Sequence, residues 1–284
     1  MNKELGKKRF FSVLLALVTV LILGVGTFAA EDLTGNEVLA KMDNQQEVIT
    51  QGEILSVVTF KNENADGTTS TNKFGALARR KENKPNVTLL YYLQPEYISG
   101  SILLSKDNTD GGTDMWLYLP ALGQVKKLST SAKQKSFAGS TLSREDIGSR
   151  TMGDEYNAEI VEETTVEVGE KSIPAYKLSL TAKEGIDPDY PKRTVWVGQN
   201  NWLLLRSEEY DSAGQLMKEM MVKELTTFEG NTVTKELVTT DIDAGASTTV
   251  IYGSRERPEQ DVPDSVFDPE NLKDFDPAKW GLGE

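Results

Sequence analysis

The feature that most constrains this chain is a long succession of short runs in which apolar and polar side chains alternate. Such alternation places successive side chains on opposite faces of a β-strand. Turn signals such as Asp66-Gly67 and Gly230-Asn231 separate most of the runs, which favours a meandering antiparallel sheet that curls into a barrel or half-barrel. The predicted strands cover residues 53–61, 72–80, 87–94, 100–106, 114–119, 124–129, 158–168, 173–182, 193–198, 203–211, 216–228, 232–241 and 247–252.

One helix precedes the strands. Thr34 and Glu37 have the spacing of a capping box, in which each residue's side chain accepts a hydrogen bond from the other's backbone amide. Val38, Leu39 and Met42 follow on one side of a helix of roughly three to four turns. We find no linker composition and no repeat of fixed period, so residues 30–284 are expected to form a single domain.

The N-terminus has the organisation of a secretory signal. Four basic residues lie within the first nine positions, and an uncharged apolar run follows at residues 10–28. The small residues at its end predict a signal peptide over residues 1–29, with cleavage after Ala29 or Ala30. A cleaved signal predicts a periplasmic protein. The alternative is an uncleaved segment that anchors the chain to the inner membrane.

Composition narrows the chemistry. The chain contains neither histidine nor cysteine, so it has no imidazole base or ligand and no thiolate. We therefore expect no enzyme activity, and we assign no catalytic residue, metal ligand or cofactor. Carboxylate-pair hydrolysis and an all-oxygen calcium site remain formal alternatives. Without residues 1–29, which carry four basic residues and one acidic, the net charge changes from −13 to −16, which disfavours nucleic acid as a partner.

The most aromatic predicted strand is bulky on both faces. In residues 114–119 the alternation places Met115, Leu117 and Leu119 on one face and Trp116 with Tyr118 on the other. Residues 87–94 behave similarly, with Leu89, Tyr91 and Leu93 on one face. Such strands are either buried on both sides or have one face that lines an apolar cavity for lipid chains. The alternation leaves both interpretations open.

Several ordered blocks resemble the LolA-like outer membrane lipoprotein-sorting family, in its uncharacterised branch. The aromatic strand matches the family pattern D-x-W-x-Y-x-P and leads into a basic strand and a Phe-x-Gly-Ser loop that opens an acidic short helix. In that loop Thr141 stands where the family usually has Asp, and Ala138 where it has a larger apolar residue. The matching blocks are residues 89–100, 114–120, 125–128, 137–147, 193–197 and 208–211.

The resemblance implies an unclosed, strongly curved antiparallel sheet wrapped over a few helices, with an apolar cavity between them. It also implies a carrier that accepts lipoprotein acyl chains or phospholipid at the inner membrane and releases them at the outer membrane. Partners would be an inner-membrane export complex and an outer-membrane acceptor. The alternative is a periplasmic sensor or scaffold that binds a protein partner. The cavity candidates are Leu89, Tyr91, Leu93, Met115, Trp116, Leu117, Tyr118, Leu119 and Trp196, and the loop candidates are Phe137, Gly139 and Ser140.

Two further segments carry expectations. Residues 255–284 are rich in proline and acidic residues with isolated apolar side chains, which predicts irregular turns and short helices packed on the sheet. Arg79, Arg80 and Lys81 close a predicted strand and are expected to be solvated charges. Contact with a lid loop or a lipid head group is the alternative.

Overall fold

The computed structural model describes residues 33–108, 112–129, 136–142 and 151–282. The predicted signal peptide and the acidic short helix predicted after Ser143 lie outside these residues. Within them the strands form one 13-stranded antiparallel sheet in the order β6-β5-β4-β3-β2-β1-β13-β12-β11-β10-β9-β8-β7. The strands are β1 (Gly52–Glu63), β2 (Thr69–Arg80), β3 (Val87–Gln94), β4 (Ile102–Asp107), β5 (Thr113–Leu119), β6 (Gln124–Lys127), β7 (Tyr156–Val168), β8 (Lys171–Ala182), β9 (Lys192–Gly198), β10 (Leu204–Tyr210), β11 (Leu216–Phe228), β12 (Asn231–Asp241) and β13 (Ala246–Glu256).

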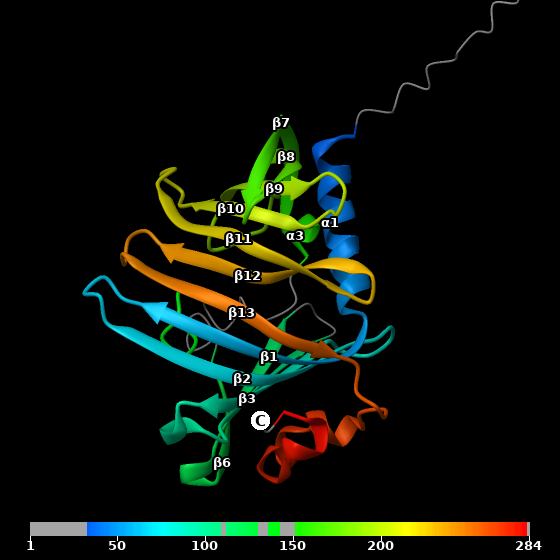
Figure 1. Cartoon of the computed structure of the whole chain (residues 1–284), viewed down its shortest axis with the longest axis vertical. Coiled ribbons are helices and arrows are strands. Elements are labelled where there is room, and N and C mark those ends of the chain that lie inside the picture. Colours follow the sequence, from blue (N-terminus) through cyan, green and yellow to red (C-terminus); the bar gives the residue numbers. More distant parts are fainter. Residues whose placement is uncertain (1–32, 109–111, 130–135, 143–150, 283–284) are drawn as a thin grey trace, which may run out of the picture. The chain divides into compact units, whose positions relative to one another are not determined.

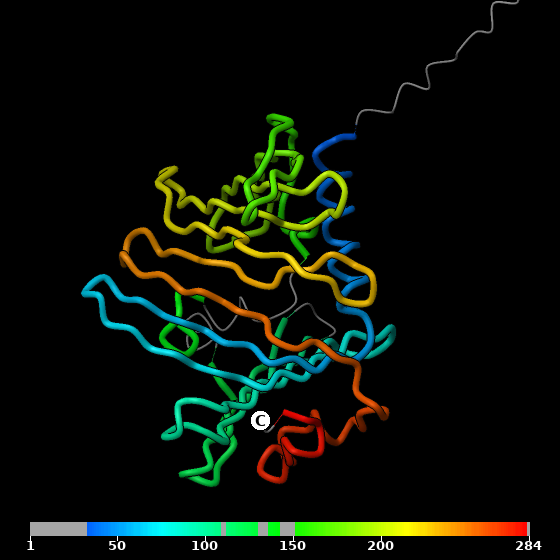
Figure 2. Tube along the Cα trace, in the orientation of Figure 1, coloured from blue at the N-terminus to red at the C-terminus, as the bar shows by residue number. Residues whose placement is uncertain are grey.

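The sheet consists of two meanders. Strands β1 to β6 follow one another in space and form the first meander, and β7 to β13 do the same and form the second. The two meanders are joined where β1, the first strand of the chain, pairs with β13, the last. Figure 2 shows these two strands side by side, cyan against orange, in the middle of the sheet. Because β6 and β7 lie at opposite ends of the order, the curved sheet does not close. The predicted strands and the antiparallel curved sheet are confirmed, in the half-barrel form.

The helix before the sheet is α1 (Gly35–Thr50). The Thr34 amide donates to the Glu37 carboxylate over 2.7 Å, and the Glu37 amide donates to the Thr34 hydroxyl over 3.3 Å. The predicted capping box is therefore confirmed. Asn36 accepts a hydrogen bond of 2.8 Å from the backbone amide of Ala158, on the edge strand β7. A Cβ at Gly35 would lie 2.3 Å from the carbonyl oxygen of the same Ala158, so only glycine permits this approach.

The face of the sheet that α1 covers is called the inner face. Val38, Leu39 and Met42 of the helix are buried against side chains of β7, β8 and β9, including Leu178 and Val195. Residues directly opposite each other in an antiparallel pair share a face, so the register extends this face across the sheet. One such row runs through Ile160, Leu178, Val195, Ser207, Met220, Thr239, Thr248 and Asn62.

The opposite, outer face of β2 to β5 is covered by the segment that follows β13 (Figure 1). This C-terminal segment, residues 257–282, contains the 3-10 turns η4 (Asp264–Phe267), η5 (Pro269–Asp274) and η6 (Ala278–Trp280). Its buried side chains pack against buried residues of β2, β3 and β4. On the segment these are Val262, Phe267, Leu272, Trp280 and Leu282, and on the sheet Leu77, Val87, Leu89, Ile102 and Leu104.

A buried arginine ties the C-terminal segment to the sheet. Arg79 is only 4% exposed and donates to Glu53 over 2.9 Å and to Asp264 over 2.6 Å. Its guanidinium also donates to the Val262 carbonyl and lies 4.4 Å from the ring centroid of Phe267. The expectation that Arg79 is a solvated charge is therefore wrong. Its buried carboxylate partner, Glu53, and its exposed one, Asp264, lie 26 and 185 positions away in sequence, where strand periodicity carries no signal.

Within the described ranges, none of the helices combines the length and the apolar character that crossing a bilayer requires.

Candidate functional site

The inner face of the first meander is apolar at its centre. Its buried side chains come from β1, β2, β3, β4 and β13, and they surround one side chain from outside the sheet, that of Phe137. The buried sheet residues are Val58, Phe60, Phe74, Ala76, Leu90, Tyr92, Leu103 and Val250. A sheet of this kind needs a second layer over such a surface. Among the described residues, that layer is the segment 136–142, which we call the inner cover.

Phe137 is the apolar anchor of the inner cover. It is 1% exposed, and its ring centroid lies 5.9 Å from Phe60, 5.2 Å from Phe74 and 5.9 Å from Tyr92. Aromatic pairs at these distances add specific contacts to the burial of their area. The ring therefore fills the centre of the apolar face from the solvent side.

The rest of the inner cover is held by neutral hydrogen bonds. The side-chain amides of Asn62 and Asn72 both donate to the Ala138 carbonyl, over 3.1 and 3.0 Å. The Thr141 amide donates to the Thr248 hydroxyl over 2.9 Å, and that hydroxyl donates to Asn62 over 3.0 Å. These sheet side chains are buried because the cover lies on them. The cover thus supplies hydrogen-bond partners to buried polar groups of the sheet, although Asn62 also bonds Ser70 and Thr248 within the sheet.

The loop candidates Gly139 and Ser140 shape the turn within the cover. The backbone amide and the hydroxyl of Ser140 donate to the Phe137 carbonyl, over 2.9 and 2.6 Å. Gly139 has φ +69°, a left-handed conformation that glycine adopts without strain. The Thr141 hydroxyl bonds to that of Thr239, so the residue that departs from the family pattern still anchors the loop to the sheet.

The cavity candidates fall on both faces of the sheet. Met115 and Leu117 lie opposite Ser105 and Leu103 on the inner face, and Leu119 shares it by alternation. The others, apart from Leu93, belong to the outer face. Leu93 is half-buried at an irregularity in the register of β2 and β3. The outer-face candidates are Leu89, Tyr91, Trp116, Tyr118 and Trp196.

The outer-face candidates do not form one site. Leu89 is fully buried under the C-terminal segment, and Tyr91 packs against Phe275 with ring centroids 5.9 Å apart. Trp196 lies on β9, where its ring faces Arg206 at 4.6 Å and Lys177 at 5.2 Å. These are cation–π contacts on the second meander, remote in the strand order from the first.

The polar side chains that hold the inner cover were not predicted from the sequence. Asn62, Asn72, Thr239 and Thr248 are all buried on the inner face, at positions where alternation continues an apolar row. A polar residue in an apolar row was the available signal. The pairing itself depends on residues that lie up to 107 positions apart.

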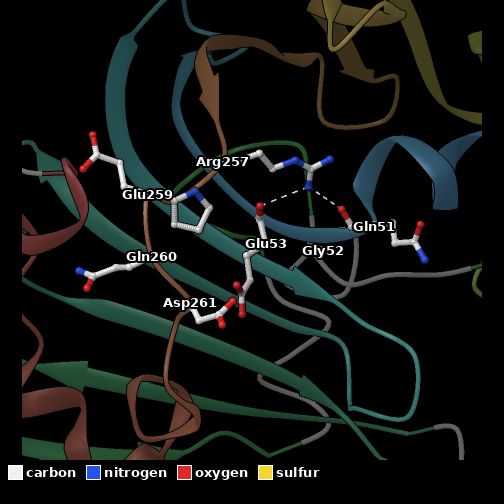
Figure 3. Close-up of a pocket in the computed structure, with 8 residues that line it drawn as sticks. Gln51, Gly52, Glu53, Arg257, Glu259, Gln260 and Asp261 are labelled. Atoms are coloured by element: carbon white, nitrogen blue, oxygen red, sulfur yellow. Dashed lines mark hydrogen bonds between the residues drawn. The ribbon is translucent and has the colours of Figure 1, made fainter.

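A groove of about 510 Å³ lies between the start of β1 and the start of the C-terminal segment (Figure 3). Arg257 crosses it, donating to the backbone carbonyls of Gln51 and Glu53, and its guanidinium also binds Glu229 over 2.7 Å. The groove is polar and holds none of the predicted cavity residues. Its lining comprises Gln51, Gly52, Glu53, Arg257, Pro258, Glu259, Gln260 and Asp261.

Solved structures share this architecture, which is that of the LolA-like proteins. A DUF1329 family protein from Desulfovibrio piger has a TM-score of 0.73 at 24% identity, covering 83% of this chain and 97% of that one. A putative outer membrane lipoprotein-sorting protein domain from Vibrio parahaemolyticus has a TM-score of 0.69 at 23% identity, covering 84% and 98%. A LolA superfamily protein from Nitrosomonas europaea has a TM-score of 0.61 at 20% identity, covering 83% and 98%.

The family follows from the sequence. A family model described as that of an uncharacterized protein matches residues 84–274, about two thirds of the chain. The chain belongs to this family of uncharacterized proteins. No curated protein has a matching sequence.

Proposed function

We propose that this protein is a periplasmic carrier that binds lipoprotein acyl chains or other lipids on the inner face of the first meander and moves them toward the outer membrane. The observation that carries the proposal is the inner cover. A broad apolar face is closed by residues 136–142 through one fully buried apolar anchor, Phe137, with Ala138 and Leu142 partly buried beside it, and through a set of neutral hydrogen bonds.

The energies of the two states support exchange. Burying an acyl chain of about twelve CH₂ groups gains about 10 kcal/mol at ~0.8 kcal/mol per group. Displacing the inner cover loses the burial of Phe137, about 3 kcal/mol, the partial burial of Leu142, and several neutral hydrogen bonds of about 1 kcal/mol each. These quantities are similar, so a chain can displace the cover and still be released. A carrier needs this balance.

Among the sequence-derived candidates, we propose that Met115, Leu117 and Leu119 line the lipid site. They lie on the inner face of β5, at the side of the apolar cluster away from β13. Phe137 with its Gly139-Ser140 turn would be the part that leaves. The outer-face candidates of β3 and β5 would reach lipid only if the C-terminal segment also left the sheet, which its buried anchors oppose.

The compartment and the partners follow from the same proposal. A signal peptide over residues 1–29 would export the chain to the periplasm, where a shielded site for acyl chains has a use between two membranes. Cargo would come from an inner-membrane export complex and pass to an outer-membrane acceptor. Binding and release require no bond to be made or broken, so we propose no enzymatic step.

Native mass spectrometry of the protein purified from the periplasm, after expression of the full chain, tests the proposal. We expect co-purified lipid that a fluorescent acyl probe displaces. Leu117→Asn, on the inner face, should weaken probe binding, whereas Tyr118→Asn, on the outer face of the same strand, should not. Absence of both lipid and probe binding would refute the carrier and favour the scaffold alternative.

A further inference from the structure

Two polar side chains of β13 lie on the inner face beside its apolar centre. Arg255 is opposite Ser56 of β1, and Tyr252 is opposite Val58. The guanidinium carbon of Arg255 lies 4.5 Å from the centroid of the Tyr252 ring, so the two side chains are stacked. Both are half-buried, and Tyr252 packs against the same apolar cluster as Phe137.

Arg255 differs from the other buried or half-buried arginines in its partners. Arg79, Arg193, Arg206 and Arg257 each bind a carboxylate, and Arg80 donates to two backbone carbonyls and to the Thr88 hydroxyl. Within the part of the chain that the structure describes, Arg255 has no ion pair and no hydrogen bond, and its contact is with the Tyr252 ring. The Tyr252 hydroxyl has no hydrogen-bond partner there either.

The surroundings make this lack of partners among the described residues unfavourable. Burial lowers the pKa of Arg255 and raises that of Tyr252, which means that both charged forms are poorly solvated there. An arginine keeps its proton even so, because its intrinsic pKa lies far above neutral pH. A desolvated cation without an anion raises the free energy of the folded protein. An oxyanion supplied by a ligand would remove that penalty.

Arg255 also stands at the end of a continuous apolar row. Direct cross-strand pairs connect it to Ser56 and then to one apolar residue on each of four further strands. At about 4.8 Å between strands, the row spans about 24 Å. Its members after Arg255 and Ser56 are Ala76, Leu90, Leu103 and Leu117. A cation at one end of an apolar row is complementary to an amphiphile with one anionic head group and an apolar tail.

We propose that Arg255, with the Tyr252 hydroxyl, binds the oxyanionic head group of an acyl ligand, a carboxylate or a phosphate, while the acyl chain lies along the row from Ala76 to Leu117. This proposal rests on the carrier function and specifies its cargo. Free fatty acids and phospholipids carry such a head group. The planar guanidinium fork matches both oxyanions bidentately, whereas a neutral analogue with the same tail would leave the cation unpaired.

The overall negative charge does not oppose this site locally. Residues 52–127, which contain β1 to β6, carry nine basic and eight acidic side chains, whereas residues 156–256 carry ten basic and 18 acidic. The proposed acyl track lies on the balanced half. Salt at physiological concentration screens the acidic half beyond about 8 Å.

Competition binding with lipid-free protein, purified from the periplasm after expression of the full chain, tests the proposal. Palmitate, hexadecanol and palmitoyl lysophosphatidic acid are each used to displace a neutral fluorescent acyl probe. We expect at least one of the two anions to displace the probe at a concentration about tenfold below that of hexadecanol, as a charge-assisted hydrogen bond requires. The anion that does so identifies the head group.

In Arg255→Gln this tenfold difference should disappear while displacement by hexadecanol stays unchanged. The matched control is Lys61→Gln, which removes the same charge from the outer face of β1 and should keep the difference. Arg255→Lys, which retains the charge without the fork, should keep part of the preference. This variant and the wild-type comparison decide the matter if Arg255→Gln does not fold.

Two results would overturn the proposal. Equal displacement by hexadecanol and by both anions in the wild type would leave an acyl carrier without a head-group site. A preference for an anion that persists in Arg255→Gln would likewise exclude Arg255 as the head-group ligand. If no acyl probe binds the wild type at all, the carrier function fails as well, so the two failures are distinguishable.

Discussion

The first meander is covered on its two faces in different ways. On the outer face, the C-terminal segment buries five apolar side chains and adds the buried ion pair of Arg79 with Glu53. On the inner face, the inner cover buries Phe137 and holds the rest of its backbone by amide and hydroxyl hydrogen bonds. A Cβ added at Gly75 would lie 2.8 Å from Leu282, so the outer contact is also tight at the backbone.

This difference indicates which face exchanges its cover. The free energy gained by apolar burial grows with the buried area, so exposing five buried anchors costs much more than exposing one. Neutral hydrogen bonds are each worth about 1 kcal/mol, because water replaces the partner when the cover leaves. The C-terminal segment therefore belongs to the permanent core, whereas the inner cover is suited to exchange with a lipid chain.

The largest expected effect on the free energy of unfolding comes from the C-terminal segment. Trp280→Ala removes an indole that is 5% exposed from the cluster under the C-terminal segment. We expect the free energy of unfolding to fall by about 3–5 kcal/mol, as for other large-to-small changes in a core. Urea unfolding followed by circular dichroism measures it. A loss below about 1 kcal/mol would show that this segment is not part of the core.

Phe137→Ala provides the matched test on the inner face. Phe137 is even less exposed than Trp280, so burial alone predicts an equal loss. If the cover detaches while the sheet stays folded, the loss cannot exceed the free energy of docking the cover. Ordering the backbone of the cover offsets most of the free energy of its contacts, so the net free energy of docking is small. We therefore expect the free energy of unfolding to fall by about 1–2 kcal/mol, below the ~3–5 kcal/mol that truncating an aromatic side chain in a core costs.

Hydrogen exchange gives the second readout for the inner cover. The amides of Ser140 and Thr141 should exchange well before those of Trp280 and Leu282 in the wild-type protein. Equal losses in the two aromatic variants together with equal protection of the two covers would remove the distinction between them.

Asn62→Ala probes the hydrogen bonds of the inner cover with a smaller effect. It removes a donor to the Ala138 carbonyl, which keeps its bond from Asn72, and it leaves the buried Thr248 hydroxyl without its acceptor. We expect the free energy of unfolding to fall by about 1 kcal/mol. Asn64→Ala, in the exposed turn after β1, is the control and should change it by less than about 0.5 kcal/mol. Equal losses would assign the effect to the strand and not to the cover.

The strands and the helix cap were predictable because their determinants are local. Alternation at residues 216–228 and the Thr34–Glu37 spacing each lie within a few residues of the structure they specify. The allocation of faces was not predictable. Trp116 and Leu117 are neighbours that are both large and apolar, and which of them faces the inner side depends on where α1 and residues 257–282 pack.

The polar residues of the site were missed for a related reason. Arg79 and Arg255 are both arginines near strand ends, and sequence pattern treats them alike. The fold gives Arg79 two carboxylates, one of them from Asp264, and gives Arg255 a tyrosine ring. Their difference therefore depends on long-range partners, which a single sequence does not specify.

The smallest expected effect is a dependence on pH that distinguishes the two covers. Hydrogen bonds from Lys84, and then from Arg79, hold the pKa of Asp264 below its ordinary value. A carboxyl whose pKa is lower in the folded state stabilises it at pH values above the unfolded pKa, which is about 3.9. That contribution is lost as the pH falls through this value toward the folded pKa. Asp264→Asn should therefore be less stable than wild type at neutral pH and equal to it in acid, as unfolding across a pH series measures.

The inner cover is bonded through Asn, Ser and Thr side chains and backbone groups, which do not titrate in this range. The protection factors of Ser140 and Thr141, corrected for intrinsic exchange, should stay constant from neutral pH down to about pH 4, the ordinary pKa of a carboxyl in the unfolded chain. Protection that falls earlier would mean that a carboxylate also holds the inner cover. An equal loss of amide protection in the inner cover and the C-terminal segment below that pH would instead indicate global acid unfolding. The Asp264→Asn series distinguishes this case, because that variant lacks the carboxylate of the C-terminal segment that binds Arg79.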